Sequence, residues 1–131
     1  MLREFHRVLK QGGRIAGYVI HTPAGLSAED EQRAADLGPS AVASPAPTEE
    51  MVADAGLEIA AQEDVTESFR DTCQAILDVR AQLADKLRAE EGSALYDEEQ
   101  EKNAAMVIGI DESLLVRSLF LIEKKGNVRR I

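Results

Sequence analysis

The first twenty residues constrain the fold most, because they read as a helix, a tight turn and a strand in direct succession. Apolar residues recur at helical spacing at Leu2, Phe5, Val8 and Leu9. Gly12 and Gly13 end this helix, since glycine adopts left-handed backbone conformations without a Cβ clash. Residues 14–20 (RIAGYVI) are apolar almost throughout after the arginine, which favours a strand buried on both faces of a parallel or mixed sheet.

The next segment predicts a long loop, two helices and a second strand. Residues 21–47 are rich in Ala, Gly, Ser and Pro, interrupted by a helix predicted over Ser27 to Leu37 that Ser27 caps. Thr48 begins another helix, which runs to about Ala55 and is closed by Gly56. Residues 57–65 (LEIAAQEDV) alternate well enough to predict a strand.

The remaining chain is mostly helical and ends in a third strand. An apolar stripe from Phe69 to Leu87 predicts one helix over 66–91, with Gly92 after it. A second helix is predicted over Leu95 to Val107, so that 66–107 form a helical insertion, followed by a short segment at 111–115. Residues 116–123 (VRSLFLIE) alternate as a strand. The predicted order is therefore an α/β pattern with only three strands.

Composition excludes several classes of function. The net charge of −9 argues against a nucleic-acid partner, because polyanions repel an acidic surface that shows no basic face. A single cysteine, Cys73, rules out an internal disulfide framework and a thiolate zinc site, and fits a reducing cytoplasm. No apolar run approaches the roughly 18 residues that a membrane span needs.

Three segments together resemble class I S-adenosylmethionine-dependent methyltransferases. The first 20 residues resemble the helix and double glycine that lead into the family's fifth strand, and that strand itself, although Gln11 stands where the family usually has proline. Residues 49–66 (EEMVADAGLEIAAQEDVT) resemble the helix ending in Ala-Gly before the sixth strand, and 117–125 (RSLFLIEKK) resemble the last, antiparallel strand. The first segment matches the family pattern at Glu4, Arg7, Val8, Leu9, Lys10, Gly12, Gly13 and Arg14.

The resemblance implies a partial Rossmann-like sheet that supplies only the family's strands five to seven. Residues 1–131 would then form the C-terminal, acceptor-side half of one methyltransferase domain. The loops that hold S-adenosylmethionine in the intact family have no counterpart here, so we expect this chain alone to bind no cofactor and to be inactive. Gly12, Gly13 and Gly17 do not replace those loops, because they follow a helix rather than open one.

Few side chains are candidates for chemistry. His21 follows the first strand, where open α/β sheets place their ligand crevice, and is a weak candidate for a base or an acceptor contact.

His6 and Cys73 are expected to be structural, and no metal ligands are predicted. The helix over 67–91 suits either a lid over the acceptor or a core helix. An acidic cluster is expected to be a solvated helix face: Glu90, Glu91, Asp97, Glu98, Glu99 and Glu101.

Two other readings stay open at this stage. One is an active methyltransferase whose cofactor site forms across a homodimer, and the other is a non-enzymatic interaction module derived from the same fold. An uncovered strand edge pairs readily with another polypeptide, so the expected partners are an N-terminal methyltransferase half or a second copy of the chain. The methyl acceptor does not follow from the sequence.

Overall fold

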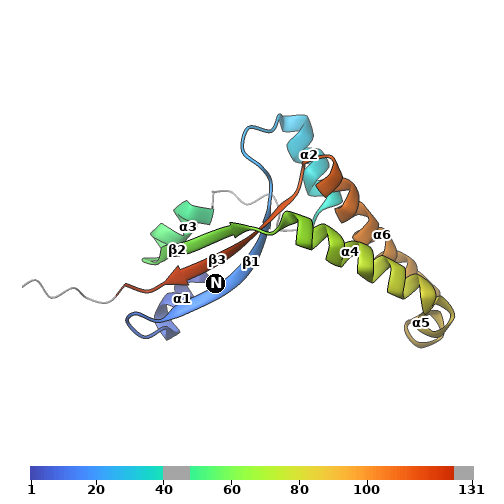
Figure 1. The fold of residues 1–131 in the computed structure, drawn as a ribbon, viewed down its shortest axis with the longest axis horizontal. Helices are drawn as coiled ribbons and strands as arrows, with labels where there is room; N and C mark the ends of the chain where they lie inside the picture. The colour runs from blue at the N-terminus through green and yellow to red at the C-terminus, as the bar shows by residue number, and fades with distance from the viewer. Residues whose placement is uncertain (40–47, 126–131) are drawn as a thin grey trace, which may run out of the picture. The chain divides into compact units, whose positions relative to one another are not determined.

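The computed structural model describes residues 1–39 and 48–125 of the 131-residue chain. The described residues form three strands and six helices, shown in Figure 1. They fall into two compact units, which are treated separately below. The sheet unit contains residues 1–19, 48–64 and 118–125, and the helical unit contains 20–39 and 65–117.

The three strands form one sheet in the order β1-β3-β2, with the last strand of the sequence in the middle (Figure 1). The strands are β1 (Arg14–His21), β2 (Glu58–Asp64) and β3 (Val116–Glu123). β2 pairs antiparallel with β3, with a register shift between Ile59 and Ala61. These bounds lie within one residue of the predicted ranges, and the expected mixed α/β class with an antiparallel last strand is confirmed.

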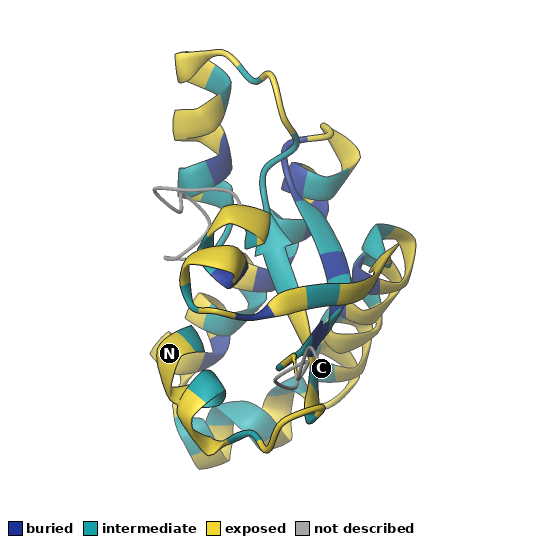
Figure 2. Cartoon of the chain, turned by 90° about the vertical axis from the view of Figure 1, so that its left-hand side faces the viewer, coloured by how far each residue is buried: buried dark blue, intermediate teal, exposed yellow. Residues whose placement is uncertain are grey.

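The helices α1 (Leu2–Val8) and α3 (Thr48–Asp54) supply the apolar cover of one sheet face. On β3 the buried residues Ser118, Phe120 and Ile122 alternate with half-buried neighbours. Figure 2 colours the chain by burial. Phe120 is only 1% exposed. Because side chains alternate between the faces of a strand, this pattern defines one packed face and one open face. The packed core joins Val52, Leu57, Phe120 and Ile122 to Leu2, Phe5, Leu9, Ile15 and Val19.

The turn between α1 and β1 needs both glycines, as the sequence predicted. Gly12 has a φ of +76°, which only glycine adopts at little cost, and a Cβ on Gly13 would lie 2.7 Å from the Lys10 carbonyl oxygen. The Gly12 N–H donates to the Lys124 carbonyl over 2.7 Å, and the Lys124 N–H donates to the Gly13 carbonyl over 2.9 Å. The turn is therefore joined to the end of β3 by backbone hydrogen bonds.

The helical unit contains α2 (Ala28–Leu37), α4 (Thr66–Gln82), α5 (Ala84–Glu91) and α6 (Ser93–Asp111). The long helices α4 and α6 run side by side, and α5 connects their ends (Figure 1). Ser27 caps α2 as predicted, because its hydroxyl oxygen accepts a 3.1 Å hydrogen bond from the Asp30 N–H. Two small cores hold the unit together: one centres on Ala34, Leu114 and Leu115, and the other on Phe69, Cys73 and Val107.

The single helix predicted over 66–91 is wrong, because the chain breaks at Leu83 between α4 and α5. Contacts with α6 and α5 accompany the break: the Tyr96 hydroxyl of α6 donates to the Arg80 carbonyl over 3.2 Å, and Arg80 pairs with Glu91 of α5 over 2.9 Å. The Tyr96 ring also lies against two guanidinium groups, with Arg88 4.3 Å and Arg80 5.2 Å from its centroid. The apolar stripe continues across the break, so periodicity alone did not reveal it.

The prediction for the second helix was too short, since α6 runs without interruption from Ser93 to Asp111. Residues 112–115 form a turn that leads into β3 rather than a further element. Gly109 lies inside its last turns, where a glycine lowers helix propensity. The packing explains its presence, because a Cβ at this position would meet the Leu115 side chain at 2.6 Å.

The expectation that β1 is buried on both faces is also wrong. Within the described chain, Arg14, Ala16, Gly17 and Tyr18 are exposed, and Tyr18 is 62% exposed. β1 is an edge strand in the order β1-β3-β2, and α1 and α3 cover only one face of the sheet. An apolar run predicts a strand that is able to be buried, whereas burial itself depends on what packs against it.

Candidate functional site

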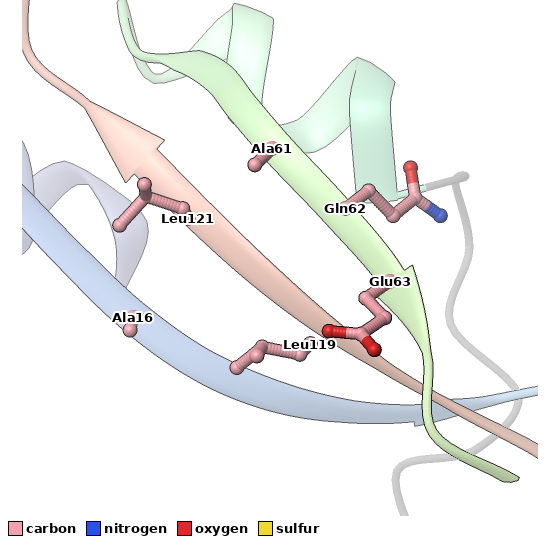
Figure 3. A pocket seen from close by; sticks show the side chains of 6 residues that line it. All are labelled: Ala16, Ala61, Gln62, Glu63, Leu119 and Leu121. Atoms are coloured by element: carbon pink, nitrogen blue, oxygen red, sulfur yellow. The ribbon is translucent and has the colours of Figure 1, made fainter.

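The open face of the sheet carries an apolar hollow of about 470 Å³ (Figure 3). Its lining comes from all three strands: Ala16 of β1, Leu119 and Leu121 of β3, and Ala61, Gln62 and Glu63 of β2. In Figure 3 the Glu63 carboxylate turns towards Leu119 at one end of the hollow. We call this surface the open sheet face. Its chemistry suits the burial of another apolar surface, because Glu63 is the only ionisable group among the described residues that line it.

A second hollow of about 310 Å³ lies in the helical unit between α2 and α6. Leu37, Ala105 and Met106 form its apolar part, and charged groups on both helices surround them. Lys102 lies 3.5 Å from both Glu98 and Glu99, whose charges raise the pKa of its ammonium group, Glu99 having the larger effect. The positive charge of this hollow is therefore already matched by neighbouring carboxylates.

His21 is the last residue of β1 and is half-buried in the helical unit. Its Nδ1 lies 3.1 Å from the Thr22 carbonyl oxygen, and since a carbonyl only accepts, Nδ1 carries the donated proton in this contact. In the neutral ring this tautomer puts the basic lone pair on Nε2. The arrangement is compatible with a base or an acceptor contact, and the role of His21 stays a prediction.

The other two single candidates occupy structural positions. The His6 ring lies against the tight turn at Gly56, where a Cβ would meet its Cδ2 and Nε2 atoms at 3.2 Å. The His6 carbonyl also accepts a 2.7 Å hydrogen bond from the Lys124 ammonium. Cys73 is buried beside Phe69 and Val107, and this burial raises the pKa of its thiol, which disfavours the nucleophilic thiolate.

The acidic cluster is mainly engaged in ion pairs. Glu91 pairs with Arg80 and Asp97 pairs with Arg88, each over 2.9 Å, and Glu98 and Glu99 flank Lys102. Among the residues that the structure describes, no three His, Cys, Asp or Glu side chains are grouped so as to hold a metal ion. Glu91 thus links α5 to α4 and Asp97 links α6 to α5, whereas the pairs of Lys102 lie within α6.

The sequence predicted that the helix over 67–91 is either a lid over the methyl acceptor or a core helix, and α4 has features of both. Phe69 and Cys73, in the first half of α4, are part of the core. Ile76, Val79 and Leu83 follow at helical spacing and are 40%, 52% and 46% exposed. The second half of α4 therefore presents an apolar stripe to its surroundings, which is compatible with contact to a substrate or a partner.

Sequence reasoning missed a bidentate ion pair that ties the start of α4 to the end of α6. Arg70 donates from Nε and Nη2 to the two carboxylate oxygens of Asp111, at 2.5 and 3.0 Å. These hydrogen bonds lower the pKa of Asp111 and raise the pKa of Arg70. The two residues are 41 positions apart, so no local spacing rule could have paired them.

Comparison with known proteins gives a match by structure only. No protein-family model and no curated protein matches the chain. A putative sarcosine dimethylglycine methyltransferase from Galdieria sulphuraria matches with a TM-score of 0.79 and 13% identity, over 97% of this chain and 47% of that one. Haemonchus contortus phosphoethanolamine N-methyltransferase 2 matches with a TM-score of 0.73 and 16% identity, over 95% and 29%. Mycolic acid cyclopropane synthase matches with a TM-score of 0.76 and 12% identity, over 94% and 51%.

The chain therefore has the fold of part of a methyltransferase domain, as its three sequence segments predicted. It spans between 29% and 51% of the length of these solved structures. At such low identity the match establishes the fold alone, because one fold hosts many activities. None of the helices in the described residues is long and apolar enough to cross a membrane.

Proposed function

We propose that this chain is the C-terminal, acceptor-side part of an S-adenosylmethionine-dependent methyltransferase, and that it is inactive alone. The observation that carries the proposal is the coverage: 97% of this chain matches a methyltransferase of which it covers only 47%. The matched part contains a three-stranded sheet in the order β1-β3-β2. One of the similar structures holds S-adenosylhomocysteine, the demethylated product of the cofactor that we assign to the intact enzyme.

The described residues do not fit the cofactor itself. The glycine turn at Gly12 and Gly13 precedes a strand, whereas a nucleotide-binding loop opens a helix whose N-terminal N–H groups face the ligand. In addition, the Gly12 N–H and the Gly13 carbonyl are used in backbone hydrogen bonds with Lys124. We therefore assign no cofactor-binding residue to this chain and no step of methyl transfer to it alone.

Strand topology supports a complementing N-terminal half at the outer edge of β1. α1 and α3 pack in one core on the same face of the sheet, and α3 lies in the connection from β1 to β2. The crossover from one parallel strand to the next is right-handed. When successive crossover helices pack on the same face, each new strand is therefore added to the sheet on the same side of the strand before it. A strand that leads through α1 into β1 would consequently lie beyond the outer edge of β1. An N-terminal methyltransferase half that supplies this strand would also supply the cofactor site.

In the complemented enzyme, His21 is our candidate for an acceptor-side contact. It ends β1, and the ends of strands in open α/β sheets border the ligand crevice. The proposed setting is the cytoplasm, where the buried thiol of Cys73 would stay reduced. The methyl acceptor stays open.

The test is calorimetric titration of the purified, folded chain with S-adenosylmethionine and with S-adenosylhomocysteine. We expect no binding of either compound, with Haemonchus contortus phosphoethanolamine N-methyltransferase 2, whose structure holds S-adenosylhomocysteine, as a positive control for the assay. Circular dichroism on the same sample shows that the chain is folded. Binding with a Kd in the micromolar range would contradict the proposal and would favour the second reading, an active enzyme whose cofactor site forms between chains.

A third reading, a non-enzymatic interaction module, is favoured by one specific observation, the exposed apolar lining of the open sheet face. It predicts the same negative titration as the half-domain. The two readings differ once an N-terminal methyltransferase half is added, because only the half-domain should then gain cofactor binding.

A further inference from the structure

We propose that the open sheet face is a dimerisation surface whose occupant is a second copy of this chain. The inference goes beyond the proposed function, since it concerns how the chain behaves before any N-terminal half is bound. It is argued from residues of the sheet unit only: the apolar residues Ala16, Ala61, Leu119 and Leu121, and the charged residues Arg14, Glu63 and Glu123.

The apolar part of the face has the composition of an interface centre. Leu119 and Leu121 lie on the middle strand, with Ala16 on one side and Ala61 on the other, so that small residues flank two large ones. Ala61 pairs with Leu121 and Glu63 pairs with Leu119 in the β2–β3 register. Tyr18, which alternates with Ala16 on the same side of β1, is 62% exposed. Aliphatic and aromatic groups of this kind are enriched where two proteins meet.

The charges at the rim favour a second copy as the occupant. Arg14, at the start of β1, lies 3.5 Å from Glu123, which pairs with Glu58 at the start of β2, so Arg14 and the start of β2 share one end of the sheet. Glu63 lies near the other end of β2, and β1 and β2 flank β3, so Arg14 and Glu63 occupy diagonally opposite corners of the face. A two-fold axis that lies in the plane between two stacked faces, along the other diagonal, places Arg14 of each copy over Glu63 of the other. The surface is thus complementary in charge to itself, which a surface with one sign of charge would not be.

Both corner residues are available for such a contact. The Arg14 side chain is 59% exposed and lies 3.5 Å from Glu123, near the limit of an ion pair. Glu63 is exposed, and among residues 1–39 and 48–125 it has no ion-pair partner. Pairing across a dimer would give Glu63 an opposite charge, while Leu119 and Leu121 would be removed from water.

The experiment measures the mass of the full chain in solution by sedimentation equilibrium at about 5 and about 100 μM, a range that brackets a micromolar Kd. We expect the mass to approach twice 14.3 kDa at the higher concentration. Leu121→Asp should raise the dimer Kd by a factor of about 10 or more, because it puts a charge in the apolar centre. Val79→Asp is the matched control: it adds the same charge at a residue that is 52% exposed on α4, and should leave the Kd unchanged.

A charge exchange separates the proposed pairing from mere loss of folding. Arg14→Glu and Glu63→Arg should each raise the Kd by about 2- to 5-fold, as expected for rim ion pairs. The double variant Arg14→Glu with Glu63→Arg should restore it, although the contact of Arg14 with Glu123 inside the chain stays lost. Thermal unfolding followed by circular dichroism shows that each variant is folded.

Two results would overturn the inference. One is a folded wild-type chain that stays monomeric at the higher concentration. The other is a dimer that Leu121→Asp leaves intact, and a loss of that dimer in Val79→Asp would place the contact on α4 instead. Neither result bears on the titration with S-adenosylmethionine, so the inference and the proposed function fail independently.

Discussion

Substitution of Gly109 by alanine probes the close packing of α6 against Leu115. A Cβ at Gly109 would lie 2.6 Å from Cδ1 and 2.9 Å from Cγ of Leu115, which is only 1% exposed. Carbon atoms pack best at about 3.5–4.0 Å, so the new methyl group overlaps Leu115 by about 1 Å. Leu115 has little room to withdraw, because it packs in the core with Ala34 and Leu114.

Two opposing effects set how much Gly109→Ala changes the free energy of unfolding. Overpacking of a core costs about 1–3 kcal/mol, whereas replacement of a helical glycine by alanine gains up to about 1 kcal/mol. We therefore expect Gly109→Ala to lower the free energy of unfolding by about 0–2 kcal/mol. In a Leu115→Ala background, which itself costs about 2–5 kcal/mol, the overlapping atoms are gone. There Gly109→Ala should instead stabilise the chain by about 1 kcal/mol, a reversal of sign.

The assay is urea unfolding of the wild-type chain, both single variants and the double variant, followed by circular dichroism and analysed as a double-mutant cycle. We expect a coupling free energy of about 1–3 kcal/mol between the two positions. Should Leu115→Ala be too unstable, all four proteins are measured in the same concentration of sucrose, which favours the folded state. An equal effect of Gly109→Ala in both backgrounds would refute the close contact as the reason for a glycine inside α6.

The remaining predictions concern Cys73 and Ser27. Burial raises the pKa of the Cys73 thiol, so the folded state disfavours ionisation: its contribution to stability is complete below the unfolded-state pKa and is lost as pH rises through the folded-state pKa. Urea midpoints from pH 7 to 10 should thus fall more steeply for the wild-type chain than for Cys73→Ala, and parallel curves would contradict this. Ser27→Ala removes the cap of α2 and should cost about 0.5–2 kcal/mol, with faster hydrogen exchange confined to α2. Ser27→Asp, which keeps an acceptor oxygen, should restore slow exchange.

Local patterns were sufficient for most of the secondary structure and for its order. Helical spacing before Gly12, the apolar run after Gly13 and the alternation over 116–123 identified α1, β1 and β3. Such patterns succeed because backbone geometry sets the periodicity of each element, and glycine and capping residues act within a few positions. The family resemblance rested on the same segments and predicted the fold that the solved structures share with this chain.

Properties that depend on distant residues were decided only by the tertiary structure. The apolar stripe from Phe69 to Leu87 is compatible with one helix, and contacts between Arg80, Glu91 and Tyr96 divide it at Leu83. The Arg70–Asp111 pair likewise joins residues that the sequence separates widely. The role of His21 in chemistry stays a prediction.

Sequence alone determined that β1 is apolar enough to be buried, yet in the structure its residues Ala16 and Tyr18 are exposed on the open sheet face. The physical reason is that hydrophobicity describes how favourable burial would be, whereas burial requires a second surface that covers the strand. In this chain α1 and α3 cover one face, whereas Ala16 and Tyr18 on the other face stay exposed in the part of the chain that the structure describes.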